Sequence, residues 1–197
     1  MPREKKEIIK EDIMPLDVYI KNRKELRKNI VNFKKDRRIA LGPYATFYFE
    51  SYETMLAQVQ EMLYIEKGGD EQLKDELIAY NPLIPNGKEL TATLMFEIDN
   101  PVSRSAFLSK VGGIEEKVFI KIDGESIKAT PEEDVDRTSA KGKASSVQFI
   151  HFKFNKDQIQ NFKDKNIEVT LGIDHKSYNH ITKISDLTKA SLAKDFN

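Results

Sequence analysis

The sequence of 197 residues contains no cysteine and no tryptophan, and it contains only three histidines. The lack of cysteine excludes disulfide bonds, thiolate metal sites and iron–sulfur clusters ligated by this chain. It also excludes a cysteine nucleophile. We therefore predict no cofactor, since redox chemistry would need a centre carried by another protein.

Long apolar runs are missing as well. No stretch approaches the roughly 18 consecutive apolar residues of a membrane-spanning helix. The N-terminal segment MPREKKE is charged and does not lead into the apolar core of a signal peptide. We therefore expect a cytoplasmic protein without a membrane association.

Net charge is absent, because 32 Lys and Arg side chains balance 32 Asp and Glu side chains. The two signs are unevenly distributed. Residues 1–38 hold thirteen basic and seven acidic side chains, whereas residues 50–99 hold three basic and eleven acidic ones. Nucleic-acid-binding domains are usually strongly basic overall. The asymmetry instead favours docking of the N-terminal segment on an acidic region of the same chain or of a second copy.

The composition suits a folded chain with one core. Apolar residues make up 39 % of the sequence, and a length of 197 residues suits a single domain over residues 1–197, since chains divide beyond roughly 250 residues. We expect residues 1–11 to form a flexible lead. Residues 131–146 contain one large apolar side chain, Val135, and predict a long mobile surface loop.

Helical periodicity and end signals mark several segments. Asp12 and Pro15 are suited to begin a helix that runs to about Asp36, with an apolar stripe interrupted by the charge of Arg23. Ser51 is suited to cap a second helix. Helices are expected at about residues 12–36, 51–67, 70–80, 100–112 and 155–165, and from 185 onward.

Alternating apolar residues predict strands at about residues 45–50, 90–98, 118–122, 126–129, 147–154 and 167–173. Asp123 and Gly124 form a strong hairpin signal. The strands do not alternate strictly with helices. We therefore predict an α+β fold, with a mostly antiparallel sheet of about five or six strands, helices packed on it and an N-terminal helix.

The residues that usually carry catalysis do not form a complete motif. His175 and His180 are five residues apart, unlike the four-residue spacing of a zinc-binding pair on a helix. The segment GKAS at 142–145 lacks the hydroxyl directly after lysine that a phosphate-binding loop requires. We predict no catalytic residue and no metal site, and we favour a non-enzymatic role while an enzyme stays open.

Other polar residues are candidates for binding. Residues 80–87, with the sequence YNPLIPNG, predict a rigid loop. Glu61 lies beside an apolar helix stripe, and we expect it to be partly buried with an arginine partner. A pocket at the loop, with polar contacts from the basic run around residue 37, would suit a small ligand. The candidate binding residues are Arg37, Arg38, Glu61, Tyr80, Asn81, Pro82, His175 and Tyr178.

Several segments carry a family resemblance that covers nearly the whole chain. They include RRIALGP at 37–43, YNPLIPNGKELTATLMFEI at 80–98 and GIEEKV at 113–118. In these segments the chain resembles the bacterial domain-of-unknown-function family three-five-zero-one. At Lys176 many relatives carry proline, so we expect a different local turn here.

The resemblance implies no established activity. It implies an association with rubrerythrin-like proteins and with iron–sulfur proteins that resemble heterodisulfide reductase subunits. Our leading hypothesis is a non-catalytic accessory protein that binds a protein partner, with a redox or iron–sulfur protein as candidate. The first alternative is a small-ligand-binding protein or enzyme with a pocket at residues 80–87. The second is nucleic-acid binding through residues 21–38, which the neutral total disfavours, and a homo-oligomer stays open.

Overall fold

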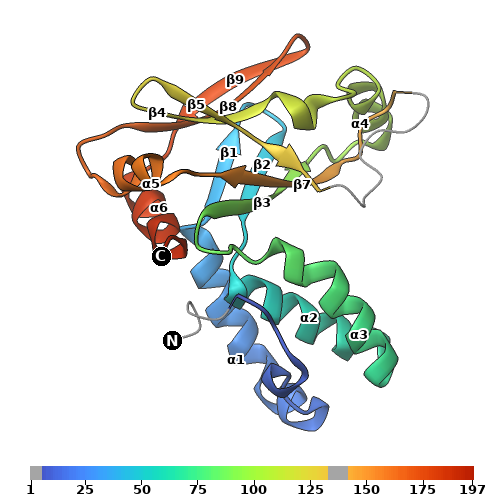
Figure 1. The fold of residues 1–197 in the computed structure, drawn as a ribbon. Coiled ribbons are helices and arrows are strands. Elements are labelled where there is room, and N and C mark those ends of the chain that lie inside the picture. Colours follow the sequence, from blue (N-terminus) through green and yellow to red (C-terminus); the bar gives the residue numbers. More distant parts are fainter. Residues whose placement is uncertain (1–5, 133–141) are drawn as a thin grey trace.

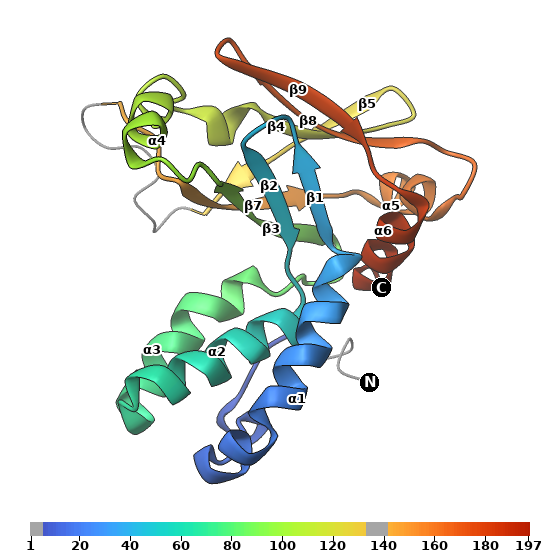
Figure 2. The same ribbon diagram turned by 180° about the vertical axis from the view of Figure 1, so that it is seen from behind.

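The computed structural model describes residues 6–132 and 142–197. Three helices form one layer, and two antiparallel sheets lie on one side of it (Figure 1). These helices are α1 (Leu16–Lys35), α2 (Tyr52–Glu66) and α3 (Gly69–Tyr80). The opposite view shows α2 between α1 and α3 (Figure 2).

The sheet nearer to the helices has the strand order β1-β2-β3-β7-β6, and all its neighbours are antiparallel. Its central strand β3 pairs Leu94 with Phe47 on one side and with Gln148 on the other. The strands are β1 (Arg38–Leu41), β2 (Ala45–Phe49), β3 (Glu89–Phe96), β6 (Thr130–Pro131) and β7 (Val147–Lys153).

The second sheet has the order β5-β4-β8-β9 and is also antiparallel throughout. It consists of β4 (Val118–Ile122), β5 (Glu125–Lys128), β8 (Val169–His175) and β9 (Tyr178–Lys183). Three helices flank the two sheets: α4 (Pro101–Leu108) at one end, and α5 (Lys156–Lys163) and α6 (Asp186–Leu192) at the other (Figure 1). Short 3-10 turns complete the chain at Lys10–Asp12, Asn81–Leu83, Ile114–Lys117 and Ala193–Asp195.

The apolar residues form two clusters. The larger one fills the space between the two sheets and includes Phe47, Leu94 and Ile120. The smaller one lies among the helices, where Met55 and Val59 of α2 meet Leu73 of α3. The larger cluster excludes water from the space between the sheets, and the smaller one from the space among the helices. Such burial of apolar surface is the main source of stability in a layered fold.

The α+β class, the antiparallel pairing and the N-terminal helix confirm the sequence-based prediction. The expected caps at Ser51, Asn155 and Ser185 are confirmed as well. Ser51 and Asn155 each accept a hydrogen bond from the backbone amide three residues later, and Ser185 does the same with Thr188. These caps satisfy backbone donors that a helix start leaves unpaired. Asp12, however, does not cap α1, whose N-cap is Pro15 without a side-chain hydrogen bond; Asp12 lies in the preceding 3-10 turn and accepts from the Ile9 amide at 3.1 Å.

The structure adds three strands, β1, β9 and the two-residue β6, and divides the strands between two sheets. β1 has four residues, and its sequence resembles a helix break because Arg37 precedes it and Arg38 is its first residue. β9 is an edge strand with one buried side chain, Tyr178, so its alternation is weak. Pairing partners, rather than local pattern, determine both strands.

Of the lead expected to be flexible at residues 1–11, the structure describes residues 6–11, and these contact the rest of the chain. The side chain of Ile8 is only 1 % exposed and belongs to the smaller apolar cluster. The Asn81 side chain accepts a hydrogen bond from the Ile8 amide at 2.8 Å and donates one to the Ile8 carbonyl at 3.0 Å. One apolar anchor and two hydrogen bonds therefore hold this segment against the body.

The expected mobile loop at 131–146 falls mainly on residues 133–141, which lie outside the described residues. Of its remaining residues, Ala144 is buried in the larger cluster, and its amide donates to the carbonyl oxygen of Leu108 at 3.0 Å. Within the described part of the chain, no helix has the length and apolar character needed to cross a membrane.

Candidate functional site

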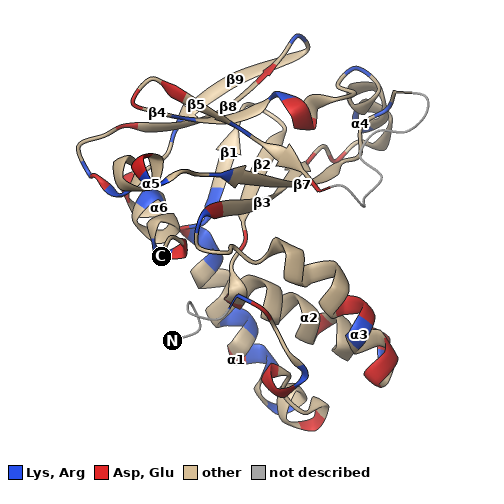
Figure 3. Cartoon of the chain, viewed as in Figure 1, with Lys and Arg blue, Asp and Glu red and all other residues tan. Residues whose placement is uncertain are grey.

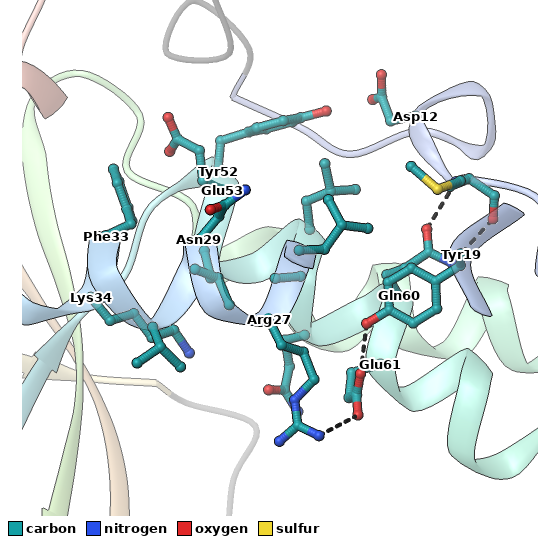
Figure 4. A pocket seen from close by; sticks show the side chains of 17 residues that line it. Asp12, Tyr19, Arg27, Asn29, Phe33, Lys34, Tyr52, Glu53, Gln60 and Glu61 are labelled. Carbon is teal, nitrogen blue, oxygen red and sulfur yellow. Dashed lines mark hydrogen bonds and ion pairs between the residues drawn. The ribbon is translucent and has the colours of Figure 1, made fainter. Parts of the chain in front are cut away.

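A cleft of about 610 Å³ lies between α1 and α2 (Figure 4). Its volume falls within the roughly 300–1,000 Å³ of sites that hold small ligands. The walls are mainly apolar, and polar side chains lie around the rim. The apolar lining residues are Met14, Tyr19, Leu26, Ile30, Val31, Phe33, Tyr52, Leu56 and Ala57.

The cleft exists because α1 packs on α2 only in part. Tyr19 is the one fully buried residue among the 20 residues of α1. Leu26 and Ile30 face α2 but stay half-exposed, and Ala57 is one of the α2 residues facing them. A methyl group at this position leaves space that a larger side chain would fill.

One end of the cleft is closed by a polar network around Glu61. The Tyr19 hydroxyl donates to the Glu61 carboxylate at 2.6 Å, and the Arg23 guanidinium donates to both oxygens of the same carboxylate. Arg23 also lies over the Tyr64 ring, 4.3 Å from its centroid. The network ties the first half of α1 to α2 and confirms the expected arginine partner of Glu61.

The network changes the proton affinity of its members. The hydrogen bond from Arg23 lowers the pKa of Glu61; burial opposes this effect, and the Tyr19 hydroxyl adds to it. Burial, followed by the hydrogen bond to Glu61, raises the pKa of Tyr19 to about 12. Both groups therefore keep their ordinary charge at neutral pH, with Glu61 ionised and Tyr19 neutral.

The N-terminal segment also contacts α2 at this end. The Gln60 amide group accepts from the Met14 amide at 2.8 Å and donates to the Met14 carbonyl at 3.1 Å. A second cavity of about 300 Å³ begins beyond this contact, and Met14 and Gln60 line both cavities.

The two rims of the cleft differ in chemistry. Figure 4 shows Arg27, Lys34 and Glu61 on one rim, and Asn29, Tyr52 and Glu53 on the other. Burial, together with a hydrogen bond to Asp12, raises the pKa of Tyr52 above its ordinary value, so its hydroxyl stays neutral. The first rim is cationic because Arg23 already neutralises Glu61.

Of the residues singled out in the sequence, Glu61 alone lines the cleft. Arg37 is 1 % exposed and forms an ion pair with Asp195. It also donates to the carbonyl oxygens of Phe49 at 3.0 Å and Glu50 at 2.7 Å. Arg38 is exposed on the edge strand β1. The structure therefore does not bring these two arginines together with Glu61.

Tyr80, Asn81 and Pro82 lie at the junction of α3 and the following turn. The Tyr80 hydroxyl accepts a hydrogen bond of 3.4 Å from Gln58, which lines the cleft, and Asn81 holds Ile8. Residues 83–85 and 87 are buried, so the loop packs as part of the core. It lines neither of the two cavities described above.

His175 and Tyr178 flank the turn between β8 and β9. The Tyr178 hydroxyl donates to the Leu41 carbonyl at 2.5 Å and accepts from the amides of Tyr44 and Ala45. His175 accepts from the Ser177 amide at 3.1 Å, and burial lowers its pKa. The contacts of Tyr178 fasten the second sheet to the turn between β1 and β2, whereas that of His175 stays within its own turn.

The basic segment 21–38 is not uniformly exposed. Arg23 and Arg37 face inward and form ion pairs with carboxylates of this chain. Figure 3 shows basic residues along α1 and a group of acidic residues at the far end of α3. Lys10 and Asp70 form a further ion pair of 2.7 Å between the lead and α3. Some of the unevenly distributed charges are thus neutralised by ion pairs within the chain.

His151 forms a polar cluster away from the cleft. Its Nδ1 atom lies 3.2 Å from Glu89, and its Nε2 atom lies 2.8 Å from Glu132. Burial alone would lower the pKa of His151, but the two carboxylates outweigh burial and raise it. Among the described residues, no group of three or more His, Asp or Glu side chains is placed to hold a metal ion.

Sequence reasoning missed Arg27, Lys34 and Ala57 as lining residues. The separation of Arg27 and Lys34 by seven residues was a usable signal, since it places both on one face of a helix. The place of Ala57 in the cleft lining depends on how two helices cross, and the sequence carries no local signal for it.

Comparison with known proteins gives a family but no activity. A crystal structure of a protein of unknown function from Burkholderia pseudomallei is 33 % identical to this chain, with a TM-score of 0.90. The match covers 96 % of this chain and 99 % of that one. No curated protein matches. Residues 7–196 match the family described as "Protein of unknown function (DUF3501)", and the chain belongs to this family.

Proposed function

We propose that this protein is a non-catalytic binding protein that holds the apolar surface of a partner in the cleft between α1 and α2. The observation that supports this role is the cleft itself, about 610 Å³ of mainly apolar space between two helices. Replacement of water in such a space by an apolar group lowers the free energy of the system. A cleft of this size is therefore suited to binding.

The polar network beside the cleft supports a binding role rather than a catalytic one. Glu61 is hydrogen-bonded by Tyr19 and Arg23, and its lowered pKa keeps it ionised. A general acid or base at neutral pH usually needs a pKa near the working pH. The network instead fixes the distance between α1 and α2 at one end and so keeps the cleft open.

The test is direct binding of an apolar fluorescent probe, anilinonaphthalene sulfonate, to the native protein. Ala57→Trp places an indole in the cleft and should reduce probe binding about tenfold or more. Ala79→Trp is the matched control, because Ala79 is an exposed residue of α3 that does not line the cleft. Urea unfolding of both variants checks that they are folded.

Equal probe binding by the wild type, Ala57→Trp and Ala79→Trp would overturn the proposal. Absence of probe binding to the wild type would count against it in the same way.

We further propose that the partner is a cytoplasmic redox protein of the rubrerythrin-like or iron–sulfur kind. The support is the family resemblance together with a chain that has no cysteine, so that the redox centre would belong to the partner. Co-purification from the native cell, followed by metal analysis, tests this step. Retention of a metalloprotein by the wild type and by Ala79→Trp, but not by Ala57→Trp, is the expected result. Retention of proteins without metal would contradict it.

A further inference from the structure

The α1 wall of the cleft carries two cations in a regular arrangement. Arg27 and Lys34 line the cleft seven residues apart, which is two helical turns or about 10 Å along the axis. The Lys34 ammonium group forms no ion pair or hydrogen bond within the described part of the chain. The Arg27 side chain is 58 % exposed, and its nearest carboxylate oxygen, on Glu61, is 4.0 Å away.

The one carboxylate on this rim, Glu61, is already paired within the chain. The Glu61 carboxylate accepts hydrogen bonds from Tyr19 and Arg23, at much shorter distances than the contact with Arg27. Arg27 and Lys34 therefore have little charge compensation from this chain. Each is available for an anionic group of a molecule that enters the cleft.

Apolar side chains extend the same flank of α1. Leu16, Ile20 and Val31 are 39 %, 52 % and 57 % exposed. At 3.6 residues per turn they fall, with Arg27 and Lys34, within a strip of about 60° around the helix. Val31 lines the cleft and Leu16 lines the second cavity. Exposed apolar side chains that share one helix flank beside an apolar cleft support an interaction surface.

The strip limits the shape of the occupant. From Leu16 to Lys34 it runs for 18 residues, or about 27 Å. A small molecule with one anionic head group would use one cation and a fraction of this length. Two carboxylates two turns apart, next to apolar residues at i, i+3, i+4 and i+7, are the pattern of an amphipathic helix in a groove.

Resting on the proposed function, we propose that the occupant is an acidic amphipathic α-helix of a partner protein. Its apolar face packs into the cleft between α1 and α2. Its Asp or Glu side chains, about two turns apart, pair with Arg27 and Lys34.

The alternative occupant, α3 of a second copy, fits the structure less well. α3 is acidic, but its apolar face is used within its own chain, where Leu73 is buried and Leu77 packs against the same cluster. Its one strongly exposed apolar side chain is Ile78. A free α3 face would therefore require the helix layer to open.

The experiment compares two labelled synthetic peptides by fluorescence anisotropy on the full chain. Both carry leucines at i, i+3, i+4 and i+7, and they differ only in glutamate or lysine at the flanking positions. The glutamate peptide should bind at least about tenfold more tightly than the lysine peptide. Added salt should reduce this preference, because exposed charges are screened.

Charge reversal in the protein provides the specific control. Lys34→Glu should weaken binding of the glutamate peptide and strengthen binding of the lysine peptide, so that the preference is reversed or abolished. Lys35→Glu changes the net charge equally, but residue 35 is exposed and does not line the cleft. It should alter the preference much less. Equal effects of the two variants would overturn the specific pairing.

The remaining outcomes separate this inference from the proposed function. If both peptides bind equally and Ala57→Trp blocks both, the cleft binds helices and the acidic partner is wrong. If dodecanoate or the apolar probe binds but neither peptide does, the helix is wrong and the binding function stands. Concentration-dependent dimers that Lys34→Glu abolishes would replace the partner with a second copy. Absence of all binding would remove both proposals.

Discussion

At the scale of single residues, Arg37 is a buried charged side chain on which the stability of the fold depends. Its side chain is 1 % exposed and donates to Phe49, Glu50 and Asp195. Loss of a buried charged donor costs about 3–5 kcal/mol, because its acceptors lose a strong partner in a place that water cannot reach. We expect Arg37→Met to lower the free energy of unfolding by about that amount.

Urea unfolding measures this change. Arg38→Met is the matched control, since the neighbouring arginine is exposed and surface changes usually stay within about 0.5 kcal/mol. Arg37→Lys should lie between the two, because lysine keeps the charge but lacks the planar fork that reaches several acceptors at once. Similar unfolding midpoints for Arg37→Met and Arg38→Met would contradict this account.

His151 makes stability depend on pH. Its imidazolium lies between Glu89 of β3 and Glu132 after β6, and the carboxylates raise its pKa in the folded state. A raised folded pKa means that the stabilisation is complete below the unfolded pKa of about 6.5 and is lost as pH rises through the folded pKa. We expect His151 to contribute less to stability at alkaline pH.

The measurement is the free energy of unfolding from about pH 6 to about pH 9, which spans the titration of histidine. The difference between the wild type and His151→Gln should shrink as pH rises. If the free energy of unfolding of the wild type falls with pH no more steeply than that of His151→Gln, the two carboxylates do not hold this proton.

At the scale of elements, the sequence predicts best what short-range contacts determine. Ser51, Asn155 and Ser185 begin their helices as expected because a cap needs only neighbours within three residues. The hairpin at Asp123 and Gly124 depends on positive φ values, which this pair adopts.

Elements that depend on partners distant in the sequence were harder to predict. β1 is short and follows a charged helix end, and it becomes a strand because β2 pairs with all four of its residues. β9 pairs with β8 at the edge of the second sheet and buries only Tyr178. Neither strand has enough apolar alternation of its own to be recognised without its partner.

The candidate site divides in the same way. The partly buried Glu61 with an arginine partner could be predicted, since Glu61 and Arg23 each lie on an apolar helix stripe. The cleft could not, because it depends on the crossing of α1 and α2 and on the small side chain of Ala57. The expected pocket at residues 80–87 rested on the rigidity of that loop. Rigidity there reflects packing, as the burial of Leu83 and Ile84 shows.

At the scale of the whole molecule, the first sheet is shared by the two apolar clusters. Its inner face supplies Phe47 and Leu94 to the cluster between the sheets, and Phe149 of β7 packs against the helical cluster. The helices α2 and α3 are attached through this second cluster. α1 contributes to neither cluster; the Glu61 network holds its first half, and the contacts of Arg37 hold the chain just after its last residue.

This distribution predicts unequal local stability. β3 is hydrogen-bonded to a strand on each side and holds Leu90, Ala92 and Leu94 without exposure, so its amides should open only with global unfolding. The amides of α1 between residues 20 and 33 should exchange much faster, because few buried contacts oppose local opening of this helix. Native-state hydrogen exchange measures both.

Ala57→Trp, by filling the cleft, should slow exchange in α1 and leave exchange in β3 unchanged. Protection of α1 equal to that of β3 in the wild type would mean that the cleft is not the loosely packed region that binding of a partner helix requires.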